Sequence, residues 1–190
     1  MPPGVSFRND CPRIPAVIEP NCQPRTPTAM PPGGAQQTST QDPTTAAQVL
    51  CSAVPDAAIR SILNGPFLIY TNPQGECHLN RTALHEPEHS IALTSTLSPL
   101  PVASFRSHDN SSWHPFRFGS LTAGYIQVWN NVRWYRVGVT PDPDAPGTLL
   151  VACRYITFAG PNTTQTIPAP PQFWTSTDNY VRQLATRITR

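Results

Sequence analysis

Residues 125–137 read YIQVWNNVRWYRV, and this stretch predicts a β-hairpin. Two runs of β-branched and aromatic residues flank the pair Asn130-Asn131, and asparagine tolerates the positive φ angles that a two-residue hairpin turn requires. A loop rich in proline and aspartate, residues 141–147, then leads into an almost continuously apolar run at 149–158. We expect that run to lie centrally in the sheet, so that the three runs form consecutive antiparallel strands.

The hairpin carries aromatic residues on both of its faces. Because successive side chains of a strand point to opposite faces, this pattern indicates that both faces are buried. The all-β fold class follows, as an antiparallel β-sandwich of jelly-roll type with short flanking helices. Further strands are expected in the short β-rich runs at 67–71, 90–97, 102–107 and 116–121.

Prolines concentrate at the start of the chain, where residues 1–45 hold 10 of the 24. This segment has too little apolar surface to offset the entropy of ordering, so we predict a disordered arm. Its basic and acidic residues balance, which does not suit an arm that neutralises packaged phosphate. A short helix is expected around Leu50, and a second over 56–63, where Pro55 favours a helix start. The predicted parts are the proline-rich arm at 1–45, a β-sandwich domain at 46–175 and an amphipathic helix at 176–190, capped by Ser176 or Thr177.

Composition restricts the functional class only weakly. All 13 basic residues are arginine, and the net charge of +2 argues neither for nor against a nucleic-acid partner. No run of 18 apolar residues occurs, so we predict no membrane span. An odd number of cysteines at irregular spacing makes a poor disulfide framework, and we expect free thiols in a reducing compartment. The five are Cys11, Cys22, Cys51, Cys77 and Cys153.

One segment matches a catalytic pattern. His85-Glu86-Pro87-Glu88-His89 reads as the HExxH motif of zinc peptidases, in which a helix places two imidazoles one turn apart. Pro87 removes a helical backbone donor and clashes with the preceding turn, so we expect a polar loop instead. Adding Cys77 or His78 gives a looser zinc-like set with no familiar spacing. We therefore predict no catalytic residue, metal ligand or cofactor, and keep a zinc hydrolase as the least favoured alternative.

A resemblance to a known family rests on two adjacent runs. WYRVGV at 134–139, the proline- and aspartate-rich loop, and LLVACRYI at 149–156 resemble the last two jelly-roll strands of the coat proteins of small non-enveloped icosahedral RNA viruses. The chain is similar to the tymovirus-like group in size, in a composition typical of cytosine-rich coding sequence with few lysines, and in its near-neutral arm. These runs and the loop between them cover about an eighth of the chain, and many β-sandwiches share them.

The resemblance implies a structural capsid protein, either shell or protruding domain, that acts by self-assembly and is not an enzyme. The partners it implies are copies of the chain, other capsid subunits and RNA, with no membrane span. The location it implies is the virion, assembled in the host cytoplasm. Within this hypothesis Arg182, Arg187 and Arg190 of the C-terminal helix are candidates for contact with RNA or a neighbouring subunit.

Aromatic residues of the hairpin form the second candidate set. Trp129, Trp134 and Tyr135 are candidates for either core or interface, and we favour the core because strand aromatics usually pack inward. A spike or a secreted β-sandwich binding module remains the alternative class. Glycan attachment at the sequons of Asn80, Asn110 or Asn162 would favour that alternative.

Overall fold

The computed structural model describes residues 6–8, 22–24, 43–63, 67–72, 74–81, 89–109, 112–157 and 168–189. The strands are Ser6–Arg8 (β1), Cys22–Pro24 (β2), Phe67–Thr71 (β3), Cys77–Arg81 (β4), His89–Ser98 (β5), Trp113–Pro115 (β6), Ala123–Val128 (β7), Val132–Gly138 (β8) and Thr148–Thr157 (β9). They form one sheet in the order β2-β1-β3-β4-β5-β9-β8-β7-β6. All neighbours pair antiparallel except β1 and β2, which are parallel.

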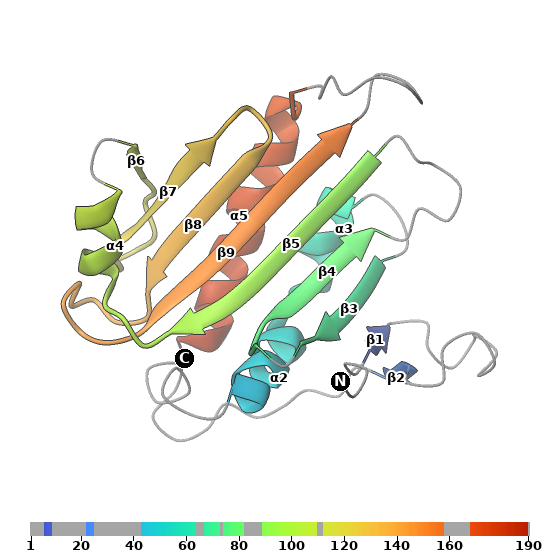
Figure 1. Ribbon diagram of the computed structural model, residues 1–190, viewed down its shortest axis with the longest axis horizontal. Helices are drawn as coiled ribbons and strands as arrows, with labels where there is room; N and C mark the ends of the chain where they lie inside the picture. Colours follow the sequence, from blue (N-terminus) through green and yellow to red (C-terminus); the bar gives the residue numbers. More distant parts are fainter. Residues whose placement is uncertain are drawn as a thin grey trace.

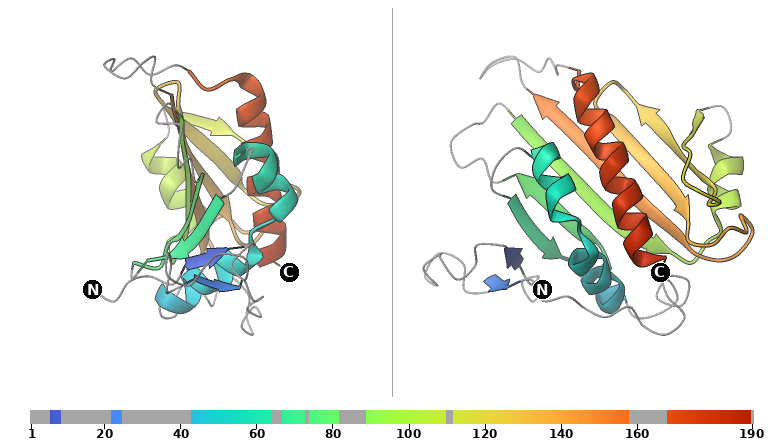
Figure 2. Two further views of the ribbon diagram at one scale, coloured as in Figure 1. Left: turned by 90° about the vertical axis from the view of Figure 1, so that its right-hand side faces the viewer. Right: turned by 180° about the vertical axis from the view of Figure 1, so that it is seen from behind.

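Three helices cover one face of this sheet. They are α2 (Pro43–Ala53), α3 (Asp56–Leu63) and α5 (Pro171–Ile188), and α5 crosses behind the central strands (Figures 1 and 2). The short helix α4 (Val102–His108) lies near β6, β7 and β8, on the side of the sheet away from α5 (Figure 2). We call the face of the sheet away from α5 the open face: α4 contacts it at one end of β8, and no helix covers its β4, β5 and β9 part (Figure 1).

Alternation along the strands builds the core between sheet and helices. In β5, for example, Leu93 and Leu97 are buried towards the helices, whereas Thr94 between them points to the open face and is partly exposed. Tyr180 and Leu184 of α5 are fully buried against this layer. Burying each such side chain stabilises the fold by about 1.5–3 kcal/mol.

The expected antiparallel, β-rich fold is confirmed, and so are its flanking helices. All strands of the described residues nevertheless lie in a single sheet, and helices cover the face where a second sheet was expected. The aromatic residues on the inner face of the hairpin pack against this helical layer; Tyr135, for example, bonds to Asp178 of α5. The expected burial of both hairpin faces is wrong for the opposite face, where Trp134 is exposed. Aromatic residues on both sides of a strand do not by themselves specify that a second layer covers each side.

Two predicted strands are wrong. The run at 102–107 is helix α4, which begins after Pro101 and buries Val102. The run at 116–121 has only an isolated bridge between Phe118 and Leu121. Both runs contain β-forming residues, but the sheet ladder does not extend to them, because tertiary pairing decides strand formation more than composition does.

The predicted boundaries can be compared with the helices. α2 begins at Pro43 and α3 covers Asp56–Leu63 as expected, with the Pro55 carbonyl accepting the Ile59 N–H bond. The C-terminal helix begins at Pro171, so Ser176 and Thr177 lie inside it and are not its cap. Proline suits the first helical position because it lacks the N–H that would go unbonded there. Most of the predicted arm at 1–45 lies outside the described residues.

The prediction of free thiols is wrong for two cysteines. Cys51 of α2 and Cys77 of β4 form a disulfide, with their Cα atoms 5.3 Å apart. Sequence spacing could not indicate this pair, because α2 must first pack across the end of β4 to bring the two residues together. Cys153 is free and buried.

No single helix of the described residues is long and apolar enough to cross a membrane. Among the described residues, Thr45–Ala53 of α2 and Asp56–Leu63 of α3 pass the test of length and composition as a pair, and the two segments are bent by 80° at their junction.

Burial raises the pKa of the Cys153 thiol to about 12, although a hydrogen bond with Thr177 and the nearby Arg133 act in the opposite direction. Burial, followed by a hydrogen bond to Asp178, also raises the pKa of Tyr135. Both groups are therefore neutral in the folded protein and ionise more readily in the unfolded chain, whose thiol has a pKa near 9.

Stability should consequently fall in alkaline solution. The contribution of Cys153 is fully present below its unfolded pKa and is lost as the pH rises from about 9 towards 12. By pH ~10.5 we expect a loss of about 2 kcal/mol from this group alone. Urea unfolding at a series of pH values would measure this loss. In the Cys153→Ala variant, the free energy of unfolding should fall less with rising pH, by that amount. An unchanged pH dependence in the variant would contradict the assignment.

Candidate functional site: a groove on the open face

The register of the sheet aligns side chains in rows across the open face. One row runs from Tyr70 (β3) through His78 (β4), Thr94 (β5) and Ala152 (β9) to Trp134 (β8). The next row contains Asn80, Ala92, Arg154 and Val132 in the same order of strands from β4. The first row has large side chains at its ends and short ones at its centre, and in the second row the short Ala92 lies between Asn80 and the longer Arg154.

This distribution of side-chain size creates a groove. Ala92, Thr94 and Ala152 form a low floor on the central strands, and the larger residues of the flanking strands stand on either side. The groove has a volume of about 560 Å³, and neighbouring strands about 4.8 Å apart separate its two walls by about 14 Å at the backbone. A concave site of this volume is typical of ligand-binding pockets.

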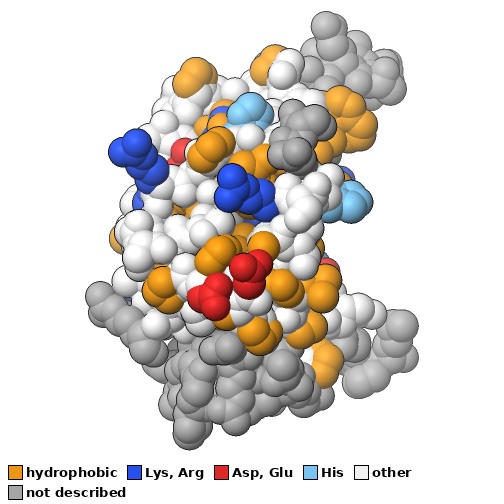
Figure 3. Space-filling model, turned by 90° about the vertical axis from the view of Figure 1, so that its left-hand side faces the viewer, with side chains coloured by type: hydrophobic (Ala, Val, Ile, Leu, Met, Phe, Trp, Pro, Cys, Tyr) orange, Lys and Arg blue, Asp and Glu red, His pale blue; other side chains and the backbone are white. Residues whose placement is uncertain are grey.

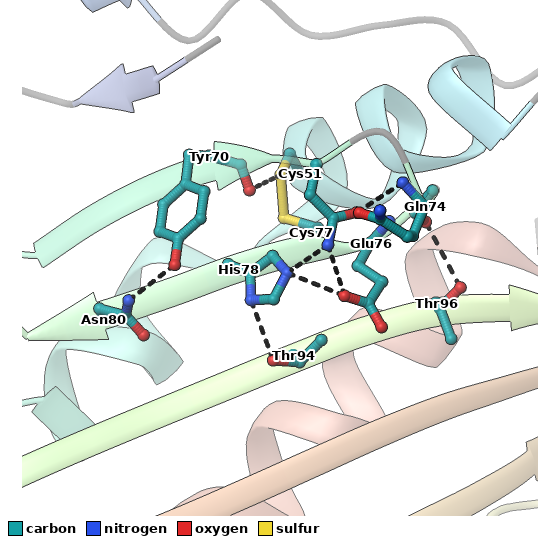
Figure 4. A network of polar contacts seen from close by, with 11 residues as sticks. Cys51, Tyr70, Gln74, Glu76, Cys77, His78, Asn80, Thr94 and Thr96 are labelled. Atoms are coloured by element: carbon teal, nitrogen blue, oxygen red, sulfur yellow. Dashed lines mark hydrogen bonds and ion pairs between the residues drawn. A yellow bond between two sulfur atoms is a disulfide. The ribbon is translucent and has the colours of Figure 1, made fainter. Parts of the chain in front are cut away.

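The wall on β3 and β4 is an ordered aromatic pair. The rings of Tyr70 and His78 are stacked, with centroids 5.0 Å apart and planes 7° from parallel. The amide of Asn80 donates to the Tyr70 hydroxyl at 2.9 Å, as Figure 4 shows. That hydroxyl keeps its own proton available for a further acceptor.

His78 forms polar contacts with Glu76 through one ring nitrogen and with Thr94 through the other. Its Nε2 lies 3.0 Å from Glu76 Oε2 and 2.9 Å from the amide of Asn72, and its Nδ1 lies 3.1 Å from Thr94 Oγ1 (Figure 4). Asn72 Oδ1 in turn accepts the backbone N–H groups of Gln74 and Glu76 and so closes the β3–β4 turn. The network fixes the orientation of the imidazole, and it is chemically able to transfer a proton between Thr94 and His78.

The opposite wall consists of two exposed tryptophans. Trp134 is 40% exposed on β8, and Trp129 is 79% exposed in the turn that follows β7. The turn differs from the expected two-residue Asn-Asn turn, because Val128 pairs with Val132 and Trp129 begins a three-residue loop with φ of 53°. Gln127 holds this conformation by donating to the Trp129 carbonyl at 2.7 Å.

A bulky residue at positive φ is unusual and costs about 1–2 kcal/mol. Trp129→Gly should therefore leave the free energy of unfolding within ~1 kcal/mol of the wild type, because relief of the backbone offsets the greater entropy of unfolded glycine. Thermal or urea unfolding measures this directly. A large loss of stability would show that the exposed indole is needed for folding. An unchanged free energy of unfolding would show that the indole at the groove has no role in folding.

Arg154 places a positive charge in the groove. Its cross-strand neighbours Ala92 and Val132 are uncharged, and no residue in the described part of the chain forms an ion pair with it. Arg136, which lies beyond the row of Trp134, is different: it is half-buried beside Asp109 and its guanidinium lies over the rings of Phe105 and Trp134. Burial lowers the pKa of Arg136, and the nearby Asp109 opposes that shift.

The structure separates the residues that the sequence singled out. Tyr135 lies in the core, and its hydroxyl donates to Asp178 at 2.6 Å. Trp129 and Trp134, for which the core was also favoured, are exposed. Arg187 donates to the carbonyls of Ala53 and Val54 at the end of α2. These placements leave Trp129 and Trp134 as the exposed members of the set.

Arg182 and Arg190 are the two other arginines that the sequence singled out in the C-terminal helix. Arg182 lies over the Phe116 ring, 4.3 Å from its centroid, and Arg190 is outside the described residues. Contact of these arginines with RNA or a neighbouring subunit stays a prediction.

The HExxH segment cannot be compared with the structure. Residues 85–88 lie outside the described part of the chain, and His89 begins β5. Among the described residues no group of three histidine, cysteine, aspartate or glutamate side chains could hold a metal ion.

Sequence reasoning did not single out Tyr70, Thr94 and Arg154 of the groove, and it named Asn80 only as a sequon. It also missed strand β4, whose residues 77–81 read CHLNR. The alternation of Cys77 and Leu79 with His78 and Asn80 was a usable signal of period two, although the segment lacks the β-branched residues that usually mark a strand.

Comparisons of the chain with protein-family models, with curated proteins and with solved structures give no match. The function must therefore be argued from the groove itself.

Proposed function

We propose that this protein is a binding module, not an enzyme, and that it takes its ligand in the groove on the open face. The observation that carries the proposal is the combination of a low floor, two aromatic walls and a few hydrogen-bonding side chains on a part of the open face where no helix lines the groove. An apolar concavity with a small number of placed polar groups is the usual composition of a ligand site.

The His78 network supports binding more than catalysis. Thr94 lies on a central strand, where its backbone N–H belongs to the sheet ladder and does not point into the groove. Acyl transfer from a hydroxyl nucleophile needs N–H donors directed at the developing oxyanion. The network instead gives the wall a fixed shape, which reduces the entropy that binding would cost.

Fragment mapping tests the proposal. Backbone amide NMR shifts, recorded with a chemically mixed fragment set, should cluster on Ala92, Thr94 and Ala152 at the floor of the groove. Trp134→Ala should reduce these shifts, and Arg60→Gln, an exposed change on α3, should not. Shifts that cluster elsewhere, or fragments that leave the floor residues unaffected, would refute the proposal.

The disulfide supports a location for such a module. Disulfides persist in oxidising compartments and are rare where thiols are kept reduced. The Cys51–Cys77 bridge therefore favours the secreted or surface-exposed class of binding module over assembly in a reducing cytoplasm.

A self-assembling structural protein is the second candidate, and one observation favours it. Trp129 and Trp134 are exposed on the side of the open face, and two copies packed through the part that no helix covers would place one sheet against another. The end of the molecule at α4 and β6 also exposes hydrophobic side chains among basic and acidic ones (Figure 3), and subunit contact would cover them. Copies of the chain, other capsid subunits and RNA are the partners in this proposal.

Light scattering with negative-stain electron microscopy separates the two candidates. Closed, uniform particles, or a dimer disrupted by Trp134→Ala, would support assembly. A monomer whose groove accepts fragments would support the binding module alone.

A further inference from the structure

The walls and floor of the groove define a slot with a characteristic shape. Along the row from His78 to Trp134, only the short side chains of Thr94 and Ala152 lie between the aromatic walls. Ala92 extends this floor into the next row. A low floor of methyl groups between tall ring-bearing walls fits a flat ring better than a branched or globular group.

The polar groups of the groove are unevenly placed. Asn80 and Thr94 offer amide and hydroxyl groups on the β4 side of the floor. Arg154 supplies a guanidinium beside Ala92, and no acidic residue of the described chain lines the groove. The groove therefore has an excess positive charge that an anionic group would neutralise.

The number of cations limits the kind of anion. A groove that follows a nucleic-acid strand carries several basic residues along its length, because each phosphate needs neutralisation. Here Arg154 is the one arginine that lines the described groove. A small ligand with one anionic group matches this charge.

We propose that the groove binds a flat ring that carries one anionic group, such as a nucleoside monophosphate or an aromatic carboxylate. The ring lies on Ala92 and Ala152, its polar edge meets Asn80 and Thr94, and its anionic group pairs with Arg154. Trp129 covers the bound ring from the rim, and its φ of 53° holds the indole out from the core for this purpose. This inference rests on the proposed binding function of the groove.

The full-length protein can be titrated with four ring probes and one ring-free anion. The anionic rings are adenosine monophosphate and naphthoate, their neutral counterparts are adenosine and naphthalenemethanol, and the ring-free anion is inorganic phosphate. Calorimetry gives the affinity, and tryptophan fluorescence reports contact, since Trp129 and Trp134 both line the groove. We expect at least one anionic ring to bind roughly tenfold more tightly than its neutral counterpart.

Variants of the groove test which residue contacts the anionic group of the ligand and which contacts its ring. Arg154→Gln should abolish the preference for the anionic ring, and Arg154→Lys should keep part of it. Trp134→Ala should weaken the anionic and neutral rings alike, and Trp129→Gly should weaken binding roughly fivefold without loss of stability. Arg60→Gln, an exposed arginine on the helical side of the sheet, should behave as the wild type.

The outcomes distinguish this inference from the function beneath it. Preference for the phosphate or the carboxylate ring identifies the source of the anion. Equal binding of charged and neutral rings, tight binding of inorganic phosphate alone, or no binding of any probe overturns the ligand class. In each of those cases, fragments that still map to the groove floor leave the binding function intact, and fragments that do not map there refute both.

Discussion

Replacing Cys51 and Cys77 together by alanine should lower the free energy of unfolding by about 3–4 kcal/mol. The disulfide closes a loop across a sequence separation of 26 and joins α2 to β4. Without it the unfolded chain gains entropy, while the folded state keeps most of its contacts. Urea unfolding followed by tryptophan fluorescence measures the difference.

Reduction provides the matched control for this prediction. Wild-type protein treated with a reducing agent should unfold at nearly the same urea concentration as the double variant, and the variant should not respond to reduction. Cys153→Ala should retain the full response to reduction, because Cys153 lies outside the bridge. Equal unfolding midpoints for oxidised and reduced wild type would contradict the assigned contribution of the bridge.

Asp178→Ala should destabilise the protein by about 3 kcal/mol. Asp178 of α5 accepts the Tyr135 hydroxyl bond at 2.6 Å and lies 3.4 Å from the guanidinium of Arg133. The Arg133 side chain is only 15% exposed, and its guanidinium lies over the rings of Tyr125 and Trp174. Removing the carboxylate leaves this enclosed charge without its anionic partner.

Two further variants divide this loss into its parts. Asp178→Asn keeps an acceptor for Tyr135 but removes the charge, so its cost reports on Arg133. A cycle with Tyr135→Phe isolates the hydroxyl bond, for which we expect a coupling of roughly 1.5–3 kcal/mol. Asp144→Ala, at an exposed carboxylate in the β8–β9 loop, is the control and should change stability by less than about 0.5 kcal/mol. A loss equal to that control would show that the network contributes nothing.

Local patterns predicted the hairpin region best. The strands β7, β8 and β9 differ from their expected bounds by no more than two residues, because their composition and pairing agree over a short stretch of chain. The layer that covers them could not be predicted in the same way. The apolar face of α5 fits a sheet surface, and its sequence does not state which surface that is.

The groove shows the same limit. Trp129 and Trp134 attracted notice as residues, but their exposure depends on the choice of face and on a turn that begins one residue early. The row from Tyr70 to Trp134 combines five strands, and its register follows from pairings up to 58 residues apart, as between Thr94 and Ala152. Because no local signal encodes such a register, the site could be recognised only in the three-dimensional structure.

The position of α5 in the chain has a consequence for synthesis. The central pair β5–β9 and the helix that covers it join residues about midway along the chain to its last 20. A nascent chain that has completed only β3, β4 and β5 therefore exposes an apolar sheet surface to the cell until α5 leaves the ribosome. Domains usually fold as whole units, and such exposed surfaces are where chaperones act. The disulfide needs only α2 and β4, so it can close earlier and hold the amino-terminal half of the sheet in register during that interval.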